Sequence, residues 1–258
     1  MTPQLPTNPG PIGIFDSGYG GLTILRQIRG MMPQYDYIYL GDNARAPYGT
    51  RSFEVVYEFT RQAVLRLFEM GCRLVILGCN TASAKALRSI QQNDLPHWDP
   101  TRRVLGIIHP TVEAMGDITH TGHVGLVATP GTIRSGSYEI EAEKHYGGRV
   151  KVVSEACPMW VSLVENHEYD SPGADYFVEK RIGNLLRHDP EIDTIILGCT
   201  HFPLLLNKIL KYTPREVKIV PQGEYVASSL RNYLERHAEM ENMLTKGSTC
   251  QFYTTEQP

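Results

Sequence analysis

The chain has 258 residues, a formal net charge of −3 and 21% charged residues. This length permits one large domain or two of roughly 100–150 residues, and so weak a net charge argues against binding to nucleic acid or to a membrane surface. No apolar run approaches the roughly 20 residues of a membrane span, and residues 1–11 lack the apolar region of a signal peptide. We therefore expect a cytoplasmic globular protein with a flexible lead-in over residues 1–11.

Short apolar runs alternate with helical patterns along the chain. The predicted strands are 12–15, 37–40, 74–77, 104–108, 124–128, 150–153, 194–197 and 217–220, with a late edge strand at 250–253. The predicted helices are 21–31, 53–70, 82–91, 133–146, 174–187, 204–211 and 223–241. Regular alternation of this kind predicts an α/β protein in which mostly parallel sheets are covered by helices.

The segment 93–103 is typical of a connection between two domains, because it contains Pro96, Trp98 and Pro100. We predict domain A at 12–105 together with 222–258, and domain B at 106–221. A duplicated cysteine motif, one copy in each half, indicates that the two domains are pseudo-symmetric. The active site is then expected in the cleft between them.

The duplicated motif is the most informative feature of the sequence. The stretches 74–83 (LVILGCNTAS) and 194–203 (TIILGCTHFP) each join a buried strand to a helix through Gly and Cys. Cys79 and Cys199 therefore sit at the carboxyl edge of a sheet, where open α/β folds bind ligands, and at a helix start that favours a thiolate. The pair suggests two thiol acid/base groups that face one substrate.

Three other strand–helix junctions offer polar groups to a ligand. The turn 15–21 (FDSGYGG) carries Asp16, and the turn 41–49 (GDNARAPYG) carries Asp42 and Tyr48. A third junction carries Thr129 and Thr132. Each also has a plain structural reading, as a common glycine turn, a Pro-Tyr-Gly turn or a helix N-cap.

The remaining cysteine chemistry leaves alternatives open. The odd count of five and the wide spacing predict reduced thiols, and Cys72, Cys157 and Cys250 are expected to be inert. Cys79, Cys199 and His201 could supply three zinc ligands, but their spacing is unlike that of zinc sites, so no metal is expected. Covalent Cys–His catalysis needs one cysteine and leaves the duplication unexplained. A binding protein with a redox-sensitive dithiol remains an alternative.

Over residues 12–225 these motifs together resemble the glutamate racemase family. The resemblance rests on Asp-Ser-Gly-x-Gly-Gly-Leu at 16–22, Pro-Tyr-Gly at 47–49, Gly-Cys-Asn-Thr-Ala at 78–82 and Gly-Cys-Thr-His-Phe-Pro at 198–203. The threonines at 129 and 132, and Cys157-Pro158 followed by Glu165, fit the same pattern. One departure is Pro221-Gln222, where family members often have Asp-Ser after the last main strand.

The resemblance implies interconversion of L- and D-glutamate without pyridoxal phosphate or metal, and hence no cofactor. It implies that Cys79 takes the α-proton of D-glutamate and Cys199 that of L-glutamate, assisted by Asp16 and His201. The implied substrate-binding residues are Asp16, Ser17, Tyr48, Gly49, Asn80, Thr81, Thr129, Thr132, Thr200 and His201, with Asp42 and Glu165 in secondary roles.

The resemblance also implies a biological setting. The expected product is D-glutamate for peptidoglycan synthesis, and hence for cell-wall biogenesis and cell shape, made in the cytoplasm from a small-molecule substrate. It leaves a homodimer open, as well as a sibling activity on aspartate or another acidic amino acid.

Overall fold

The structure is a computed structural model, and it describes residues 5–256. Its internal contacts divide the chain into two compact units. The first unit is Met1–Ile107 together with Gly223–Pro258, and the second is Ile108–Gln222. The division into domain A, at 12–105 with 222–258, and domain B, at 106–221, stays a prediction.

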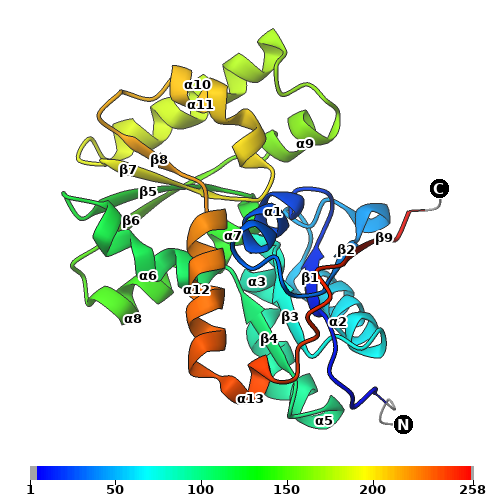
Figure 1. Cartoon of the computed structure of the whole chain (residues 1–258). Coiled ribbons are helices and arrows are strands. Elements are labelled where there is room, and N and C mark those ends of the chain that lie inside the picture. Colours follow the sequence, from blue (N-terminus) through cyan, green and yellow to red (C-terminus); the bar gives the residue numbers. More distant parts are fainter. Residues whose placement is uncertain (1–4, 257–258) are drawn as a thin grey trace. The chain divides into compact units, whose positions relative to one another are not determined.

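The first unit is a five-stranded parallel sheet with helices on both faces (Figure 1). Its strands are β1 (Ile12–Asp16), β2 (Tyr37–Gly41), β3 (Leu74–Leu77), β4 (Arg103–Gly106) and β9 (Cys250–Thr254). Helices α1 (Leu22–Met31) and α12 (Gly223–Arg236) pack on one face, and α2 (Phe53–Glu69) and α3 (Asn80–Lys85) on the other. Ile14 packs into the hydrophobic core under α1 and α12, and the next residue, Phe15, packs into the core under α2 and α3. Because both faces of a central strand are buried, its consecutive residues all need to be apolar.

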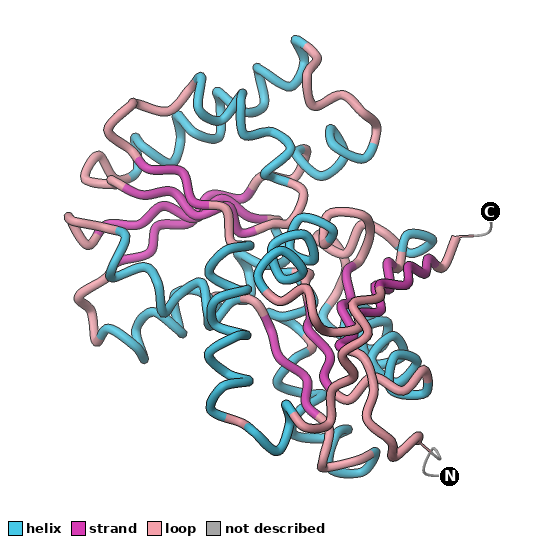
Figure 2. The backbone as a smooth tube through the Cα atoms, viewed as in Figure 1, coloured by secondary structure: helices cyan, strands magenta, loops and turns pink. Residues whose placement is uncertain are grey.

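The second unit repeats this arrangement with four parallel strands (Figure 2). The strands are β5 (His123–Ala128), β6 (Lys151–Ala156), β7 (Thr194–Gly198) and β8 (Lys218–Val220). One face is covered by α9 (Trp160–Glu165), α10 (Pro172–His188) and α11 (Leu206–Lys211). The other is covered by α6 (Ile108–Ile118), α7 (Pro130–Ser135) and α8 (Ser137–Tyr146).

The two sheets share one topology. The strand order is β4-β3-β1-β2-β9 in the first and β6-β5-β7-β8 in the second, so β1 and β3 of the first sheet correspond to β5 and β7 of the second. In each sheet the chain reverses its direction of winding between those two strands. Such a switch point opens a crevice at the carboxyl ends of the strands, which is where open α/β sheets bind ligands.

The predicted α/β class with two helix-covered parallel sheets is confirmed, and so is the edge position of β9. Some helices were missed or misjudged. Ile108 begins α6 instead of ending a strand, because β4 already ends at Gly106 and the apolar run continues through Ile107 into the helix. Helix α9 has only six residues, too few to show a period. The predicted helix 133–146 breaks at Gly136, which adopts a φ of 62°, and 223–241 breaks at His237.

The short remaining elements are η1 (Asn43–Arg45), α4 (Leu87–Ser89), η2 (Ile90–Asp94), α5 (Leu95–Trp98), η3 (Phe202–Leu205) and α13 (Ala238–Glu241). Three of them, α4, η2 and α5, fill the region in which a helix 82–91 and then an irregular connection were expected. A π-helical turn at η2 separates α4 from α5, and local residue patterns do not signal such a turn.

The flexible lead-in expected at 1–11 stays a prediction: residues 1–4 lie outside the described part, and residues 5–11 make hydrogen bonds to distant segments. The Gly10 amide donates to the Met243 carbonyl at 2.9 Å. The Pro6 carbonyl accepts hydrogen bonds from Arg73 and Arg102. Two guanidinium groups far along the chain therefore fix this segment, and its own composition gives no sign of them.

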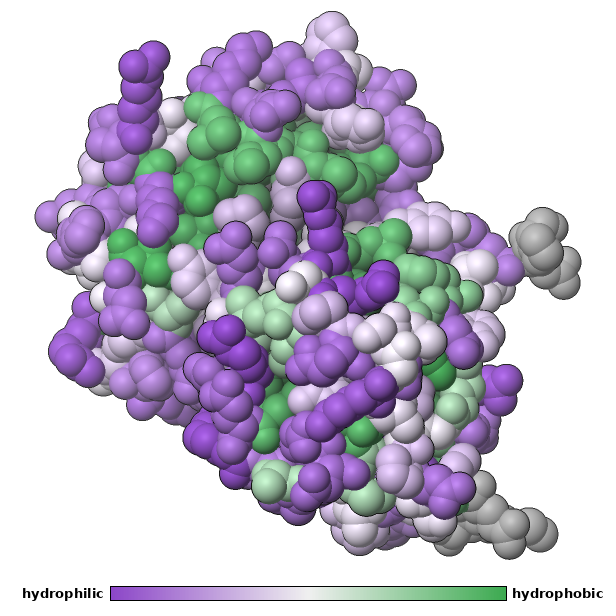
Figure 3. All heavy atoms as spheres, in the orientation of Figure 1, coloured by the Kyte–Doolittle hydropathy of each residue, from purple (hydrophilic) through white to green (hydrophobic). Residues whose placement is uncertain are grey.

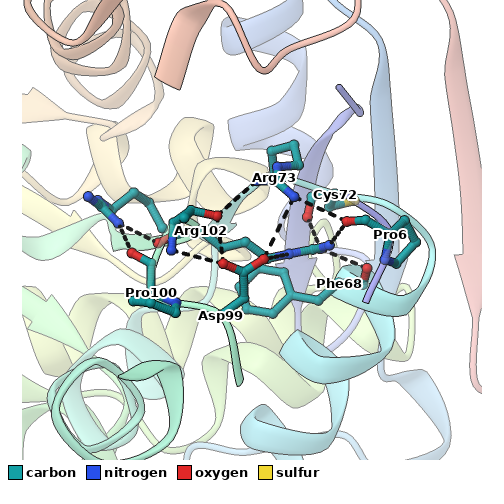
Figure 4. Close-up of polar contacts among 9 residues, drawn as sticks. Pro6, Phe68, Cys72, Arg73, Asp99, Pro100 and Arg102 are labelled. Atoms are coloured by element: carbon teal, nitrogen blue, oxygen red, sulfur yellow. Dashed lines mark hydrogen bonds and ion pairs between the residues drawn. The ribbon is translucent and has the colours of Figure 1, made fainter. Parts of the chain in front are cut away.

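Arg102 is the centre of a buried polar cluster (Figure 4). Its side chain is 0% exposed. One terminal nitrogen donates to the carbonyls of Phe68 at 2.7 Å and Cys72 at 2.5 Å, and Nε donates to Asp99 at 3.1 Å. The guanidinium thus ties together the end of α2, the loop before β3, the loop before β4 and the N-terminal segment at Pro6.

The face drawn in Figure 3 is largely hydrophilic, with hydrophobic residues showing in patches. Exposed large hydrophobic side chains include Leu204 and Leu210 in the second unit and Phe252 and Tyr253 on β9 in the first. Among the described residues, every helix is too short or too polar to span a lipid bilayer.

Candidate active site

Each unit carries one cluster of predicted site residues at the carboxyl edge of its sheet. In the first unit Asp16 ends β1 and Cys79 follows the neighbouring strand β3. The Gly78 amide donates to the Phe15 carbonyl at 2.7 Å, so the two strand ends run level. This pairing brings Asp16 and the Cys79 backbone to adjacent positions at the switch point of the first sheet.

Cys79 is the N-cap residue of α3 and is only 5% exposed. Its sulfur accepts a hydrogen bond from the Ala82 amide at 3.5 Å and lies 3.4 Å from the Ser17 hydroxyl, to which the thiol donates. When the thiol loses its proton, the Ser17 hydroxyl can turn to donate to the sulfur. A backbone N–H and a hydroxyl that point at one sulfur favour the thiolate.

Asp16 is fully buried and folds the turn that follows β1. One of its carboxylate oxygens accepts from the Gly18 amide at 2.9 Å. A Cβ at Gly21 would lie 2.4 Å from the Asp16 Cβ, so only glycine allows the start of α1 to approach this closely. The glycines of the turn therefore hold Asp16 at the edge of the sheet.

Asp42 and Tyr48 form a buried pair beside this turn. The Tyr48 hydroxyl donates to Asp42, and the Arg45 guanidinium contacts the same carboxylate at 2.7 Å. Burial, this hydrogen bond and the charge of Asp42 raise the pKa of Tyr48 well above its ordinary value. The phenol is thus neutral and its proton is committed to Asp42, which leaves its oxygen free to accept a hydrogen bond from a ligand N–H.

The other predicted residues of the first unit lie at the same sheet edge. Asn80 and Thr81 form the first turn of α3, directly after Cys79. Ser17 and Gly49 are also buried, within the turns that carry Asp16 and Tyr48. The first cluster therefore offers amides, hydroxyls and carboxylates around a single thiol.

The second unit holds Cys199 in a chain of three side chains. Cys199 Sγ lies 3.8 Å from His201 Nδ1, and His201 Nε2 is hydrogen-bonded to Glu165. The hydrogen bond from His201 lowers the pKa of Glu165, so this carboxylate is ionised and can only accept. In a neutral imidazole Nε2 then carries the proton, and Nδ1 faces the thiol with a lone pair that can receive the thiol proton.

Thr129 and Thr132 lie beside Cys199 in the second unit. Ala128 and Gly198 are register partners, so the residues that follow them, Thr129 and Cys199, leave the sheet at the same level. Thr129 caps α7, its hydroxyl lying 3.3 Å from the Thr132 amide and 3.1 Å from the Thr132 hydroxyl. Both the capping role and the pair of hydroxyls expected from the sequence are present. Thr200 is buried in the turn after Cys199.

Gln222 belongs to Pro221-Gln222, where the sequence departs from the family pattern, and its side chain is held by hydrogen bonds. Its side-chain amide donates to the Tyr138 hydroxyl at 2.6 Å and to the Thr111 hydroxyl at 2.8 Å. Burial raises the pKa of Tyr138, and the nearby Cys199 acts in the same direction. The Pro221-Gln222 turn therefore supports a neutral phenol close to Cys199, a connection that the sequence did not reveal.

The other three cysteines lie in less polar surroundings. Burial raises the pKa of Cys72 to about 12 and that of Cys157 well above its ordinary value. Cys250 on β9 also has its pKa raised by burial. These thiols stay protonated at neutral pH, in line with the inert role expected for them.

One group of potential metal ligands occurs among the described residues, and it lies away from the Cys199 cluster of its own unit. It consists of His123, Asp189 and Glu191. His123 begins β5, at the opposite end of that strand from Thr129. Asp189 is already paired with Lys151 at 2.8 Å. This group has the contacts of a structural ion-pair network.

Some supporting residues could not be found from the sequence. Arg45 lies in the turn 41–49 but had no predicted role, Tyr138 belongs to no recognisable motif, and Thr255 contacts Asp42 from the far end of the chain. The family resemblance implied only a secondary role for Glu165, and its pairing with His201, 36 residues away, was not predicted. Contacts of this kind depend on the tertiary fold and leave no local pattern.

Comparison with known proteins agrees with this geometry. Residues 22–222 match the model of the Asp/Glu/Hydantoin racemase family. The chain is 42% identical over 239 residues to a glutamate racemase of Ruegeria sp. (strain TM1040). The aligned region covers 89% of this chain and 87% of the relative.

Solved structures of the same family are similar over nearly the whole chain. Glutamate racemase isoform RacE1 from Bacillus anthracis has a TM-score of 0.86 and 34% identity, over 96% of this chain and 89% of that one. A glutamate racemase from Francisella tularensis in complex with D-glutamate has a TM-score of 0.82 and 31% identity, with the same coverage. Because the family match spans most of the sequence and the relatives cover nearly all of it, the chain belongs to the Asp/Glu/Hydantoin racemase family.

Proposed function

We propose that the protein interconverts L- and D-glutamate with two cysteines and without pyridoxal phosphate or a metal. The observation that carries the proposal is the equivalent placement of Cys79 and Cys199. Each follows the strand at the switch point of its own sheet and has proton-handling groups beside it. Relatives that are glutamate racemases support the choice of substrate.

The proposed reaction moves one proton off a carbon and another onto its opposite face. A thiolate at Cys199 takes the α-proton of L-glutamate, and the Cys79 thiol donates its proton from the other side. The product is D-glutamate, with Cys199 now a thiol and Cys79 a thiolate. The reverse reaction begins from this state, so protons and charge balance without an external base. It requires that both clusters reach one substrate, in the predicted cleft between the domains.

The groups beside each thiol give it a distinct way to change protonation state. His201, oriented by Glu165, can take the proton of Cys199 and so pair an imidazolium with the thiolate. At Cys79, the Ser17 hydroxyl and the Ala82 amide can stabilise the thiolate. We assign to Asp16 the assisting role at Cys79 that the family resemblance implies.

Hydroxyls and amides suit a substrate with two carboxylates and one ammonium group. We assign substrate binding to Asp16, Ser17, Tyr48, Gly49, Asn80, Thr81, Thr129, Thr132, Thr200 and His201. The Tyr48 oxygen, whose proton is used on Asp42, is suited to accept from the substrate ammonium. In the cell, the product would supply D-glutamate to peptidoglycan synthesis in the cytoplasm.

Purified protein tests the activity directly. We expect circular dichroism at a fixed wavelength to decay to zero from either L- or D-glutamate, with no added cofactor. The decay should persist after exhaustive EDTA treatment and in the presence of hydroxylamine, which traps carbonyl cofactors. Activity that disappears under either treatment and returns with metal or pyridoxal phosphate would contradict the proposal. Aspartate run in parallel tests the sibling activity.

His201→Asn should weaken one half of the reaction more than the other. His201 faces Cys199, so we expect α-hydrogen exchange of L-glutamate in D₂O to slow by roughly 10²-fold, the low end for a group that moves a proton. Exchange of D-glutamate should slow less. Proton NMR of each enantiomer measures this, with the exposed His120→Asn as the matched control. Equal slowing of both enantiomers would contradict the assignment of His201 to Cys199.

A further inference from the structure

The last residue of β9 and the two residues that follow it contact two of the loops that carry candidate site residues of the first unit. We call residues 254–256 the C-terminal segment. Thr254 contacts Asn43 at 3.1 Å, and Glu256 accepts from the hydroxyl of Tyr19 at 2.9 Å. Asn43 lies next to Asp42, and Tyr19 lies in the turn that holds Asp16. Strand β9 pairs with β2, which brings this segment to the carboxyl edge of the sheet (Figure 1).

Thr255 makes the most specific of these contacts. Its backbone amide donates to the Gly41 carbonyl at 3.1 Å. Its hydroxyl accepts from the Ala44 amide at 3.1 Å and donates to Asp42 at 2.8 Å. A threonine hydroxyl has a single proton, so the bond from Ala44 directs that proton to the Asp42 carboxylate.

Asp42 depends on a small number of donors because it is 0% exposed. Arg45, Tyr48 and Thr255 contact its two carboxylate oxygens. A buried carboxylate that loses a donor must recruit another group or move toward solvent. Movement of Asp42 would displace Tyr48, whose hydroxyl is bonded to it.

We propose that Thr255 is a positioning residue for the Asp42–Tyr48 pair and, through that pair, for substrate binding. The inference rests on the proposed function, because Tyr48 is assigned there to the substrate ammonium. Thr255 itself touches no substrate. It holds the loop 42–49 in the geometry in which the Tyr48 oxygen can accept a hydrogen bond from the substrate. Thr255 directly follows β9, which comes after the whole second unit in the sequence.

Three variants separate positioning from general stability. Thr255→Val keeps the size and β-branching but removes the hydroxyl, whereas Thr255→Ser keeps the hydroxyl. Tyr253→Phe is the matched control, because that hydroxyl bonds only within β9, to Gln251. We expect Thr255→Val to lower kcat/KM for glutamate by about tenfold, mainly through a higher KM, which is the scale of one hydrogen bond to a charged group. Thr255→Ser and Tyr253→Phe should stay within about twofold of wild type.

Hydrogen–deuterium exchange gives a readout that does not depend on turnover. The Ala44 amide donates to the Thr255 hydroxyl, so peptides that cover 42–49 should exchange faster in Thr255→Val and at the wild-type rate in Thr255→Ser. Wild-type kinetics and exchange in Thr255→Val would overturn the inference. An equal loss of activity and of Tm in Thr255→Val and Thr255→Ser would also overturn it, since the hydroxyl would then not matter. Wild-type protein that does not racemise glutamate would refute the proposed function, and the exchange comparison would still decide whether Thr255 positions the loop.

Discussion

Cys79→Ser and Cys199→Ser should each lower the rate of glutamate racemisation by roughly 10²- to 10⁴-fold, the range for loss of a group that moves a proton in the rate-limiting step. Serine is nearly the same size as cysteine and preserves the local packing. Its hydroxyl is far less acidic than a thiol, so it does not supply a base at neutral pH. Coupled circular-dichroism assays with each enantiomer measure the loss.

The two variants should fail in different ways. Cys199→Ser keeps the thiol assigned to D-glutamate and should retain any residual exchange of its α-hydrogen in D₂O, without inversion. Cys79→Ser should retain exchange of L-glutamate instead. Proton NMR of both enantiomers distinguishes these outcomes. Exchange with the opposite enantiomers would reverse the assignment of faces and leave the two-base mechanism intact.

Cys72→Ser, Cys157→Ser and Cys250→Ser are the controls, since burial raises the pKa of each thiol. They should keep near-normal turnover when folded. A wild-type rate in either Cys79→Ser or Cys199→Ser would show that the thiol concerned is not an essential base.

Arg102→Met should lower the free energy of unfolding by about 3 kcal/mol or more. The substitution keeps an unbranched side chain but removes the donors to the carbonyls of Phe68, Cys72 and Pro6. A hydrogen bond that involves a charged group contributes about 1.5–3 kcal/mol, and the loss of several such bonds outweighs the donors that remain, Arg73 for the Pro6 carbonyl and the Gly71 amide for the Phe68 carbonyl. The midpoint of urea unfolding followed by tryptophan fluorescence measures the change.

Arg66→Met is the matched control for this prediction. Arg66 is 65% exposed and pairs with Glu69 on the surface of α2, so its loss should change stability by no more than about 0.5 kcal/mol. Similar midpoints for Arg102→Met and wild type would show that the cluster in Figure 4 contributes little to stability.

The sequence predicted features whose causes lie within a few residues. The junctions at Cys79 and Cys199 were found because strand, glycine and cysteine are contiguous. The sheets followed because buried parallel strands need unbroken apolar runs. Helix α9 was missed because six residues do not show a helical period.

Contacts between distant segments could not be predicted in the same way. Arg102 reaches Pro6 across 96 residues, and Thr255 reaches Asp42 across 213. Nothing near Pro6 indicates an arginine partner, and nothing near Asp42 indicates a threonine donor. Such pairs are set by strand order, which the local pattern of apolar residues does not specify.

The strand order also has a consequence for synthesis on the ribosome. The second unit is continuous, so all four of its strands have been made once Val220 is added. The first sheet is complete only when β9 has been added at its edge, about thirty residues later in synthesis. N-terminal units usually fold first during synthesis, but here the sheet of the second unit can be completed before that of the first. A nascent chain that stops before β9 would carry β2 as an unprotected sheet edge, with its backbone groups open to association with other chains.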